Sequence, residues 1–391
     1  MYIEEYEAHF IPACAGWGSS LSWDFLTERQ TTIDGSEERI SLRQLPRESI
    51  SYNYTYFREE SIEINNEIQN HLRDKWICPY WFMKLSITSR QQQGAFTRII
   101  IGGDQVSSIN EMYSVEKNYP VLLYRNRDDY IFVDVMEVGG LNNGDFYIDV
   151  DDALFGVDLS KYSLYPVTFS KIIENISMNV SYEFETFSVT YASLDLPEID
   201  EYSGSIKYPP DNGIDIFTDC LPIGSNSAEV VRSRDLFISG NPLGITSYSS
   251  DWSETTISMP MNYTLKGRRE LYSLMRWLMR RMGSFRPFYM PNYLNELEFD
   301  YIVENQLILT KGDPNRMLFA LFNDDDFSII EAESVELFNG KYIYRFAENI
   351  TIEPKKVYYA SLFRLGTDSF TFEFEEGMNV IRMNTDIRSV W

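Results

Sequence analysis

The chain has 391 residues, of which 44% are hydrophobic and 15% aromatic, and its formal net charge is −25. This length is enough for two or three domains or one large β-rich body with a substantial core. The negative charge disfavours nucleic acid binding across the surface, because phosphates need cationic partners. No apolar run is long enough for a membrane-spanning helix and no secretory signal follows Met1, so we expect a protein made in a cytoplasm.

Most of the elements that the sequence predicts are strands. Residues 120–124 and 130–135 are predicted to pair across a short turn, residues 180–189 alternate less regularly, and residues 370–375 alternate strictly between aromatic and polar side chains. Turn signals rich in glycine and asparagine separate these segments. The pattern predicts a mainly β (α+β) fold with a β-sandwich or barrel-like body.

Two segments, at about residues 61–75 and 268–282, are predicted to be helices, because apolar residues recur at steps of three or four. Gly283 follows the second segment, where a left-handed glycine commonly ends a helix. The apolar positions are Ile64, Ile68 and Leu72 in the first segment, and Leu271, Met275, Leu278 and Met282 in the second.

The two predicted helices lie in matching sequence contexts. The tripeptide Asn-Tyr-Thr precedes both, at residues 53–55 and 262–264, and a proline among aromatic residues follows both. The spacing is 25 residues from Tyr54 to Pro79, and 24 from Tyr263 to Pro287. We interpret this as an internal repeat of strand, helix and Pro-aromatic strand, with one copy in each half of the chain. Chance similarity between two short amphipathic units is the alternative.

Loop-rich stretches at about residues 194–219 and 241–251 suggest three domains. We expect an N-terminal strand–helix–strand unit at residues 1–110 and a β-rich middle domain with long loops at 111–250. A C-terminal strand–helix–strand unit with closing strands would occupy residues 251–391.

The sequence contains no recognisable catalytic pattern. Its two histidines, His9 and His71, have no partner residues at the spacing of a catalytic triad or an HExxH motif, and no phosphate-binding glycine loop is present. The three cysteines are Cys14, Cys78 and Cys220, and their spacing suggests neither a disulfide framework nor a zinc site. We therefore expect no enzyme, no cofactor, and no catalytic, cofactor-binding or metal-binding residues.

Acidic clusters leave two alternatives open. Residues 149–152 and 323–326 contain carboxylates that Ca²⁺ prefers as ligands, but solvated loops are favoured in so acidic a chain. A carbohydrate-cleaving enzyme would need two carboxylates beside aromatic residues. Asp251, Trp252 and Glu254 form the one local group that fits this pattern.

A concentrated basic segment stands out against the negative charge of the chain. It could dock an acidic neighbour, such as another copy of the protein, or pair with acidic residues of its own chain. Nucleic acid is a weaker third partner, which would require the segment to face a DNA channel. The basic residues are Lys266, Arg268, Arg269, Arg276, Arg280, Arg281 and Arg286.

Several segments together resemble a family of bacteriophage tail and virion structural proteins. Residues 34–43, DGSEERISLR, followed by Pro46 and Arg47, resemble the family's opening DGxExRxxLRxxPR pattern. Residues 281–291, RMGSFRPFYMP, resemble its RRGxxxPFWxP element, and residues 362–368, LFRLGTD, resemble its closing RLxxD strand. The resemblance spreads over about residues 12–375.

The resemblance implies a virion protein of the tail or neck, made in the host cytoplasm, that assembles as a homo-oligomeric ring or hub and docks other tail proteins. It implies no membrane partner, and nucleic acid contact only with packaged DNA if the protein faces a channel. A receptor-binding or fibre-attachment protein is the alternative within the tail. Candidate interface residues are Arg268, Arg269, Arg276, Arg280, Arg281 and Arg286, together with Arg39, Arg43 and Arg47, for which a lock within the chain is slightly favoured.

Overall fold

The protein, seen in a computed structural model, is built mainly from strands. Strands account for 63% and helices for 12% of it, and the described residues form two α-helices, which confirms a mainly β fold with large antiparallel sheets. The structure describes residues 1–15, 18–32, 37–93, 96–102, 120–141, 145–151, 154, 156–173, 176–180, 184–196, 208, 210–211, 213–218, 230–233, 237–240, 246–249, 256–293, 296–323, 327–375 and 379–390.

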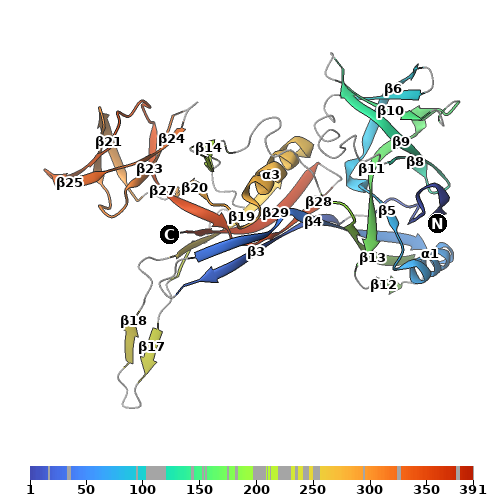
Figure 1. The fold of residues 1–391 in the computed structure, drawn as a ribbon, viewed down its shortest axis with the longest axis horizontal. Helices are drawn as coiled ribbons and strands as arrows, with labels where there is room; N and C mark the ends of the chain where they lie inside the picture. Colours follow the sequence, from blue (N-terminus) through green and yellow to red (C-terminus); the bar gives the residue numbers. More distant parts are fainter. Residues whose placement is uncertain are drawn as a thin grey trace.

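A long antiparallel sheet, which we call the central sheet, runs through the middle of the molecule (Figure 1). In order across the sheet, its strands are β12 (Ser177–Val180), β13 (Phe184–Ser193), β4 (Glu37–Phe57), β3 (Ser19–Thr31), β28 (Ser369–Glu375), β29 (Val380–Ser389), β19 (Thr256–Leu265) and β16 (Val231–Ser233).

The molecule consists of two units with the same order of elements, and each unit contributes one half of the central sheet. We name them the N-terminal unit (residues 1–196) and the C-terminal unit (residues 208–390). In each unit the chain forms, in order, a short hairpin, two strands of the central sheet, a helix and a short strand. An inserted subdomain follows, and three further strands complete the unit. The other elements of the N-terminal unit are β1 (Tyr2–Ile3), β2 (Ala8–Phe10), α1 (Arg58–His71), β5 (Trp76–Pro79) and β11 (Ser163–Ile172). Their counterparts are β14 (Pro210–Asp211), β15 (Ile214–Asp215), α3 (Gly267–Arg281), β20 (Phe288–Pro291) and β27 (Lys356–Leu365).

The strands of the two units pair in the same way. In the N-terminal unit, β12 pairs with the beginning of β13, β11 pairs with its end, and β5 pairs with β11. In the C-terminal unit, β28, β27 and β20 repeat these pairings around β29. Even the short hairpins correspond, because β2 runs parallel to β5 and Ile216 forms a parallel bridge to Tyr289 in β20. The repeat of the sequence is thus a duplication that extends over nearly the whole chain.

The registers of β5 and β20 correct one detail of the predicted repeat. Pro79 pairs with Val167 in β11, and Pro291 pairs with Ala360 at the equivalent place in β27. Pro79 therefore corresponds to Pro291, not to Pro287, which lies before β20. The second copy has more residues between its helix and its short strand than the first copy. The spacing of prolines hides this difference, because one proline lies just before β20, at Pro287, and another at its end, at Pro291.

The helices pack on the central sheet and share one hydrophobic core. Ile68 of α1 and Trp277 of α3 are buried in the same cluster as Tyr54 and Tyr263, the tyrosines of the repeated tripeptide. The apolar face of each helix therefore packs against the inward-facing side chains of the strands. This is the packing expected when apolar residues recur at every third or fourth position in a helix and at every second position in a strand.

The helices occupy the predicted segments with small shifts at their ends. At the end of α3 the backbone is left-handed at Met282 (φ 50°) as well as at Gly283 (φ 64°). The glycine that the sequence marked as a helix stop is therefore the second of two left-handed residues, and it turns the chain toward β20.

A β subdomain is inserted into each unit, and the two inserts lie at opposite ends of the molecule (Figure 1). The N-terminal insert forms a closed barrel with β11, in the order β6 (Leu85–Gln93), β7 (Phe96–Ile101), β10 (Phe146–Asp151), β9 (Asp129–Gly140), β8 (Pro120–Asn126) and β11. The C-terminal insert contains a sheet of β21 (Glu298–Val303), β22 (Gln306–Lys311), β26 (Lys341–Arg345) and β25 (Ser334–Phe338), which shares a core with β23 (Leu318–Phe322), β24 (Phe327–Glu331) and β27.

The middle domain expected at residues 111–250 is not a separate body. Strands β8, β9 and β10 close a barrel with β6 and β7, which lie in the domain expected at residues 1–110. Strands β11 to β13 complete the N-terminal unit, whereas β16 belongs to the C-terminal unit. Strands far apart in the sequence pair here, so loop composition did not reveal the boundary between the units.

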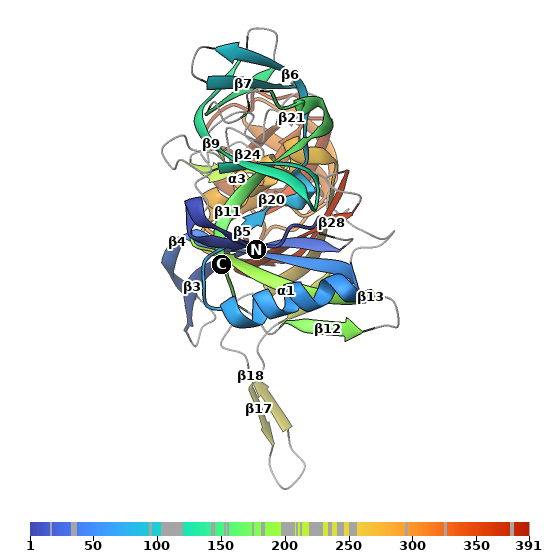
Figure 2. The same cartoon turned by 90° about the vertical axis from the view of Figure 1, so that its right-hand side faces the viewer.

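Each unit also extends a hairpin arm beyond the central sheet. In the N-terminal unit the arm is the outer part of β3 and β4, where the pairing shifts register between Asp24 and Thr27. In the C-terminal unit it is the separate hairpin of β17 (Phe237–Gly240) and β18 (Thr246–Ser249), which projects from the body (Figure 2).

Candidate assembly surfaces

The two units meet edge to edge in the middle of the central sheet, at what we call the internal joint. Strand β3 of the N-terminal unit pairs with β28 of the C-terminal unit over six residue pairs. On one face, Trp23 and Phe372 are fully buried, with ring centroids 6.4 Å apart. On the other face, the hydroxyl groups of Ser22 and Thr371 lie 2.9 Å apart. The internal joint is therefore head-to-tail, because the β3 edge of one unit meets the opposite edge of the other unit, β28, and not an edge equivalent to itself.

The three motifs that carry the family resemblance meet beside the internal joint. Arg39 donates a hydrogen bond to the carbonyl of Ser284 over 2.7 Å. The backbone N–H groups of Ser284 and Thr27 donate to the carboxylate of Asp368 over 2.8 and 2.6 Å. A Cβ atom at Gly283 would lie 2.7 Å from that carboxylate. These residues lock the first hairpin arm onto the C-terminal unit.

The arginines of the opening motif divide between the interior and the surface. The side chain of Arg39 is only 5% exposed, and Arg43 donates to the carbonyl of Asp24 over 2.8 Å. Arg47 is exposed, and the turn at residues 34–36 lies outside the described residues. The contacts of Arg39 and Arg43 fit a lock within the chain better than a docking surface.

Three arginines of the basic segment are buried inside the chain rather than displayed for a neighbour. Arg276, Arg280 and Arg281 are 5%, 2% and 3% exposed. The carboxylate of Asp215, itself buried, lies 3.2 Å from Arg280 Nε and 3.1 Å from Arg281 Nη2. Of the two alternatives, pairing within the chain therefore holds for Arg280 and Arg281, and burial removes Arg276 from the surface.

The other arginines of this segment have more accessible positions. Arg268 donates to the carbonyl of Lys84, and Arg286 donates to the carbonyl of Arg280 over 3.1 Å. Arg269 is exposed on α3. The segment is thus mainly an internal anchor, with Lys266 and Arg269 exposed on the surface.

The two histidines, far apart in the sequence, lie against each other. The rings of His9 and His71 are stacked with centroids 4.0 Å apart. His9 Nδ1 lies 2.8 Å from Glu67 Oε1, and His71 Nδ1 lies 2.7 Å from Asp74 Oδ2. Sequence reasoning missed this cluster because no spacing rule connects β2 with the end of α1.

This histidine cluster has a counterpart in the C-terminal unit. His9 lies in β2 against the end of α1, and Asp215 lies in β15 against the end of α3. Histidines and a carboxylate are also the donors that Zn²⁺ prefers, and ligand atoms of His9, His71 and Asp74 lie within 4.8 Å of one another. The shared position in the two units identifies the cluster as a clamp between hairpin and helix.

The first acidic cluster differs at one residue from the solvated loop that the sequence favoured, whereas Asp151 is exposed as expected. Asp149 is buried and forms a bidentate pair with Arg98, with distances of 2.7 and 2.6 Å. Asp152 and residues 324–326 lie outside the described residues. Asp149 on β10 is therefore joined by an ion pair to Arg98 on the neighbouring barrel strand, β7.

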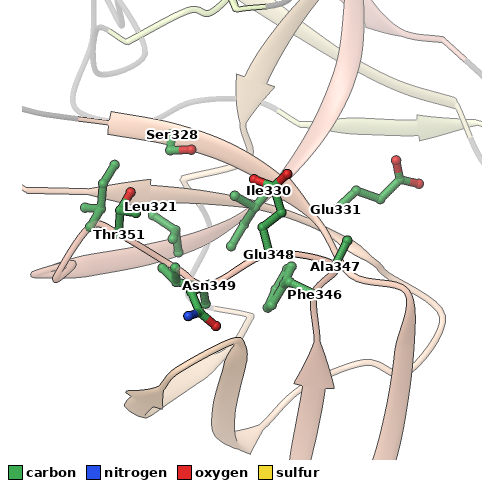
Figure 3. Close-up of a pocket in the computed structure, with 11 residues that line it drawn as sticks. Leu321, Ser328, Ile330, Glu331, Phe346, Ala347, Glu348, Asn349 and Thr351 are labelled. Carbon is green, nitrogen blue, oxygen red and sulfur yellow. The ribbon is translucent and has the colours of Figure 1, made fainter.

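A pocket of about 300 Å³ lies in the C-terminal insert, between β23, β24 and residues 346–352 (Figure 3). Its acidic lining residues are Glu331 and Glu348. The carboxylate of Glu331 points away from the other lining side chains in Figure 3, so the two acids do not converge on one point. Asp251, Trp252 and Glu254, the group proposed for carbohydrate cleavage, lie outside the described residues.

Comparison with known proteins adds no family to this description. No protein-family model matches the chain, and no curated protein matches it in a sequence search. Neither described helix is long and apolar enough to span a membrane. The duplicated units and the way in which they are joined are therefore the features that indicate a function.

Proposed function

We propose that the protein is a structural component of a bacteriophage virion, in the tail or neck, that assembles as a homo-oligomeric ring or hub and docks other tail proteins. The observation that carries the proposal is the internal joint. Two equivalent units are joined head-to-tail by strand pairing, and a head-to-tail contact that repeats generates a ring when its rotation closes.

The distribution of the resembling motifs supports the same function. All three motifs contribute residues to the lock beside the internal joint, where Arg39, Ser284 and Asp368 meet. A family that builds rings from duplicated units would keep the residues that set the angle between units. The tail or neck location is drawn from the resemblance, and the ring from the architecture.

The assembly part of the proposal is tested on the purified full chain. Native mass spectrometry and sedimentation velocity are expected to give one oligomer of defined copy number, and negative-stain images are expected to show rings. A protein that stays monomeric up to the highest soluble concentration would contradict the ring.

The virion part needs a separate measurement. Peptides of this chain are expected in gradient-purified particles of the phage that carries the gene, at a constant ratio to the other tail proteins. An antibody label on these particles should locate the chain at the tail or neck. Absence from particles that contain the other tail proteins would contradict a structural role.

A further inference from the structure

The central sheet ends in two strands whose outer edges are equivalent to the edges joined inside the chain. Strand β12 corresponds to β28, and β16 corresponds to β3. Within the described part of the chain, β12 pairs only with β13, and β16 pairs only with β19. Open strand edges carry unused N–H and C=O groups and readily pair with another chain.

The registers place β16 at the position of β3. Ser49 and Ser258 each lie five residues before the tyrosine of the repeated tripeptide. Ser49 is paired with Ser22 in β3, and Ser258 is paired with Val231 in β16. Val231 is therefore equivalent to Ser22, and Val230 to Leu21.

The same reasoning places β12 at the position of β28. Phe187 pairs with the first repeat tyrosine and with Met178. Met383 pairs with the second repeat tyrosine and with Phe372. Met178 is therefore equivalent to Phe372, and Ser177 to Thr371.

The exposure of these residues shows what differs between the joined edges and the open ones. At the internal joint, Leu21 lies opposite Phe372, and both side chains are fully buried. Met178 is 38% exposed on β12, and Val231 is 46% exposed on β16. Each open edge thus carries an exposed apolar side chain, and Val230, the equivalent of Leu21, is only partly buried. On β16 the next residue is Arg232, which forms an ion pair with Glu296.

We propose that β16 of one copy pairs antiparallel with β12 of the next copy, in the register of the internal joint. Val230 then lies opposite Met178, and Val231 lies opposite Ser177. This deepens the proposed ring function and rests on it, since it names the surfaces that join the copies. The occupant of each edge is a second copy of the chain, because the chain already contains the same contact between its own units.

Disulfide trapping tests the register. The background variant carries Cys14→Ser and Cys220→Ser, because Cys14 is exposed and Cys220 lies outside the described residues. The pair Val231→Cys and Ser177→Cys in one chain is expected to give, on mild oxidation, a ladder of crosslinked species up to the full ring. Ser22→Cys with Thr371→Cys is the matched positive control, and it should crosslink within one chain.

Mixing the two single variants separates a head-to-tail joint from other contacts. Val231→Cys mixed with Ser177→Cys should give crosslinked dimers only, and neither variant should crosslink alone. Dimers formed by one single variant alone would overturn the proposal, because they require each edge to meet its own copy. A ring that gives no crosslink in the double variant would also overturn it.

Edge-blocking variants supply a second readout. Met178→Lys and Val231→Lys place a charge on each edge. Met178→Lys is expected to weaken association more than about tenfold, because position 178 is equivalent to the buried Phe372 and the joint would bury an unpaired charge. Val231→Lys should weaken association less, because position 231 is equivalent to Ser22 on the more exposed face of the sheet. Met136→Lys is the matched control, since Met136 is 57% exposed on the barrel strand β9. Normal rings from both edge variants would refute the β12–β16 joint and leave the proposed ring intact, whereas a monomeric wild-type protein would refute both.

Discussion

Glu48, on β4 of the central sheet, is a buried carboxyl group of the N-terminal unit. It is 6% exposed, and it accepts hydrogen bonds from Trp23 Nε1 over 3.0 Å and from the Tyr80 hydroxyl over 2.5 Å. Burial raises the pKa of Glu48 above its usual value, although the two hydrogen bonds act in the opposite direction. The neutral form is therefore favoured in the folded state more than in the unfolded chain.

This raised pKa predicts how stability depends on pH. Glu48 contributes fully below its unfolded pKa, and the contribution is lost as the pH rises through the folded pKa. Glu48→Gln keeps both partners and cannot ionise, so we expect it to match the wild type near pH 4.5 and to be the more stable protein at pH 8. Urea unfolding at several pH values measures this, and a difference independent of pH would contradict the raised pKa.

Glu48→Ala serves as the contrasting variant. It removes the acceptor of the buried Trp23 N–H group, so we expect it to be about 1–3 kcal/mol less stable than Glu48→Gln at every pH. Equal stability of the two variants would show that the hydrogen bonds of Glu48 contribute nothing.

Gly283 is the residue at which the turn after α3 fits against the first hairpin arm. Gly283→Ala should cost more than about 2 kcal/mol, because a methyl group meets the Asp368 carboxylate and Phe25 in addition to the left-handed strain. Gly340→Ala is the matched control, since Gly340 is also left-handed but has open space around its Cβ position. Thermal unfolding compares them, and equal losses would show that the lock is loosely packed.

At the scale of elements, the short hairpins at the start of each unit are held by different chemistry in equivalent places. The N-terminal hairpin is clamped by His9 and His71, and the C-terminal hairpin by Asp215 with Arg280 and Arg281. The two units thus share the position of the clamp, which consists of imidazoles in the N-terminal unit and of an ion pair in the C-terminal unit.

Breaking the second clamp is expected to be costly. Asp215→Ala leaves two buried guanidinium groups without their carboxylate, so we expect a loss of about 3–5 kcal/mol. Asp300→Ala removes an ion pair with Lys341, whose side chains are 31% and 42% exposed, and should cost less than about 1 kcal/mol. Similar losses in urea unfolding would contradict the structural role of the buried pair.

The sequence predicted those elements whose signals are local. The helices were found from apolar spacing, and the hairpin of β8 and β9 and the alternating strand β28 were found from their patterns. Pairing between distant strands was not predictable, because alternation shows which face of a strand is buried but not which strand lies beside it. For the same reason Arg280 appeared as surface charge, since its partner Asp215 lies 65 residues away.

At the scale of the whole molecule, the charge of −25 means that identical copies repel one another. A joint formed by apolar side chains and strand pairing should therefore strengthen as salt screens the repulsion, for example from about 0.01 M to about 0.1 M salt, where the Debye length falls from about 30 to 10 Å. Docking of a basic segment onto an acidic neighbour would weaken over the same range. Sedimentation velocity across this series distinguishes the two.

The duplication has a consequence for symmetry. In the part of the chain that the structure describes, two nearly equivalent sheet units are accompanied by one barrel and one C-terminal insert of different construction. A closed ring would therefore have twice the rotational order in its sheets that it has in its inserts. A neighbour that contacts the sheets of such a ring would meet the higher rotational symmetry. A neighbour that contacts the inserts would meet a symmetry of half that order. It would act as an adaptor between two assemblies whose symmetries do not match.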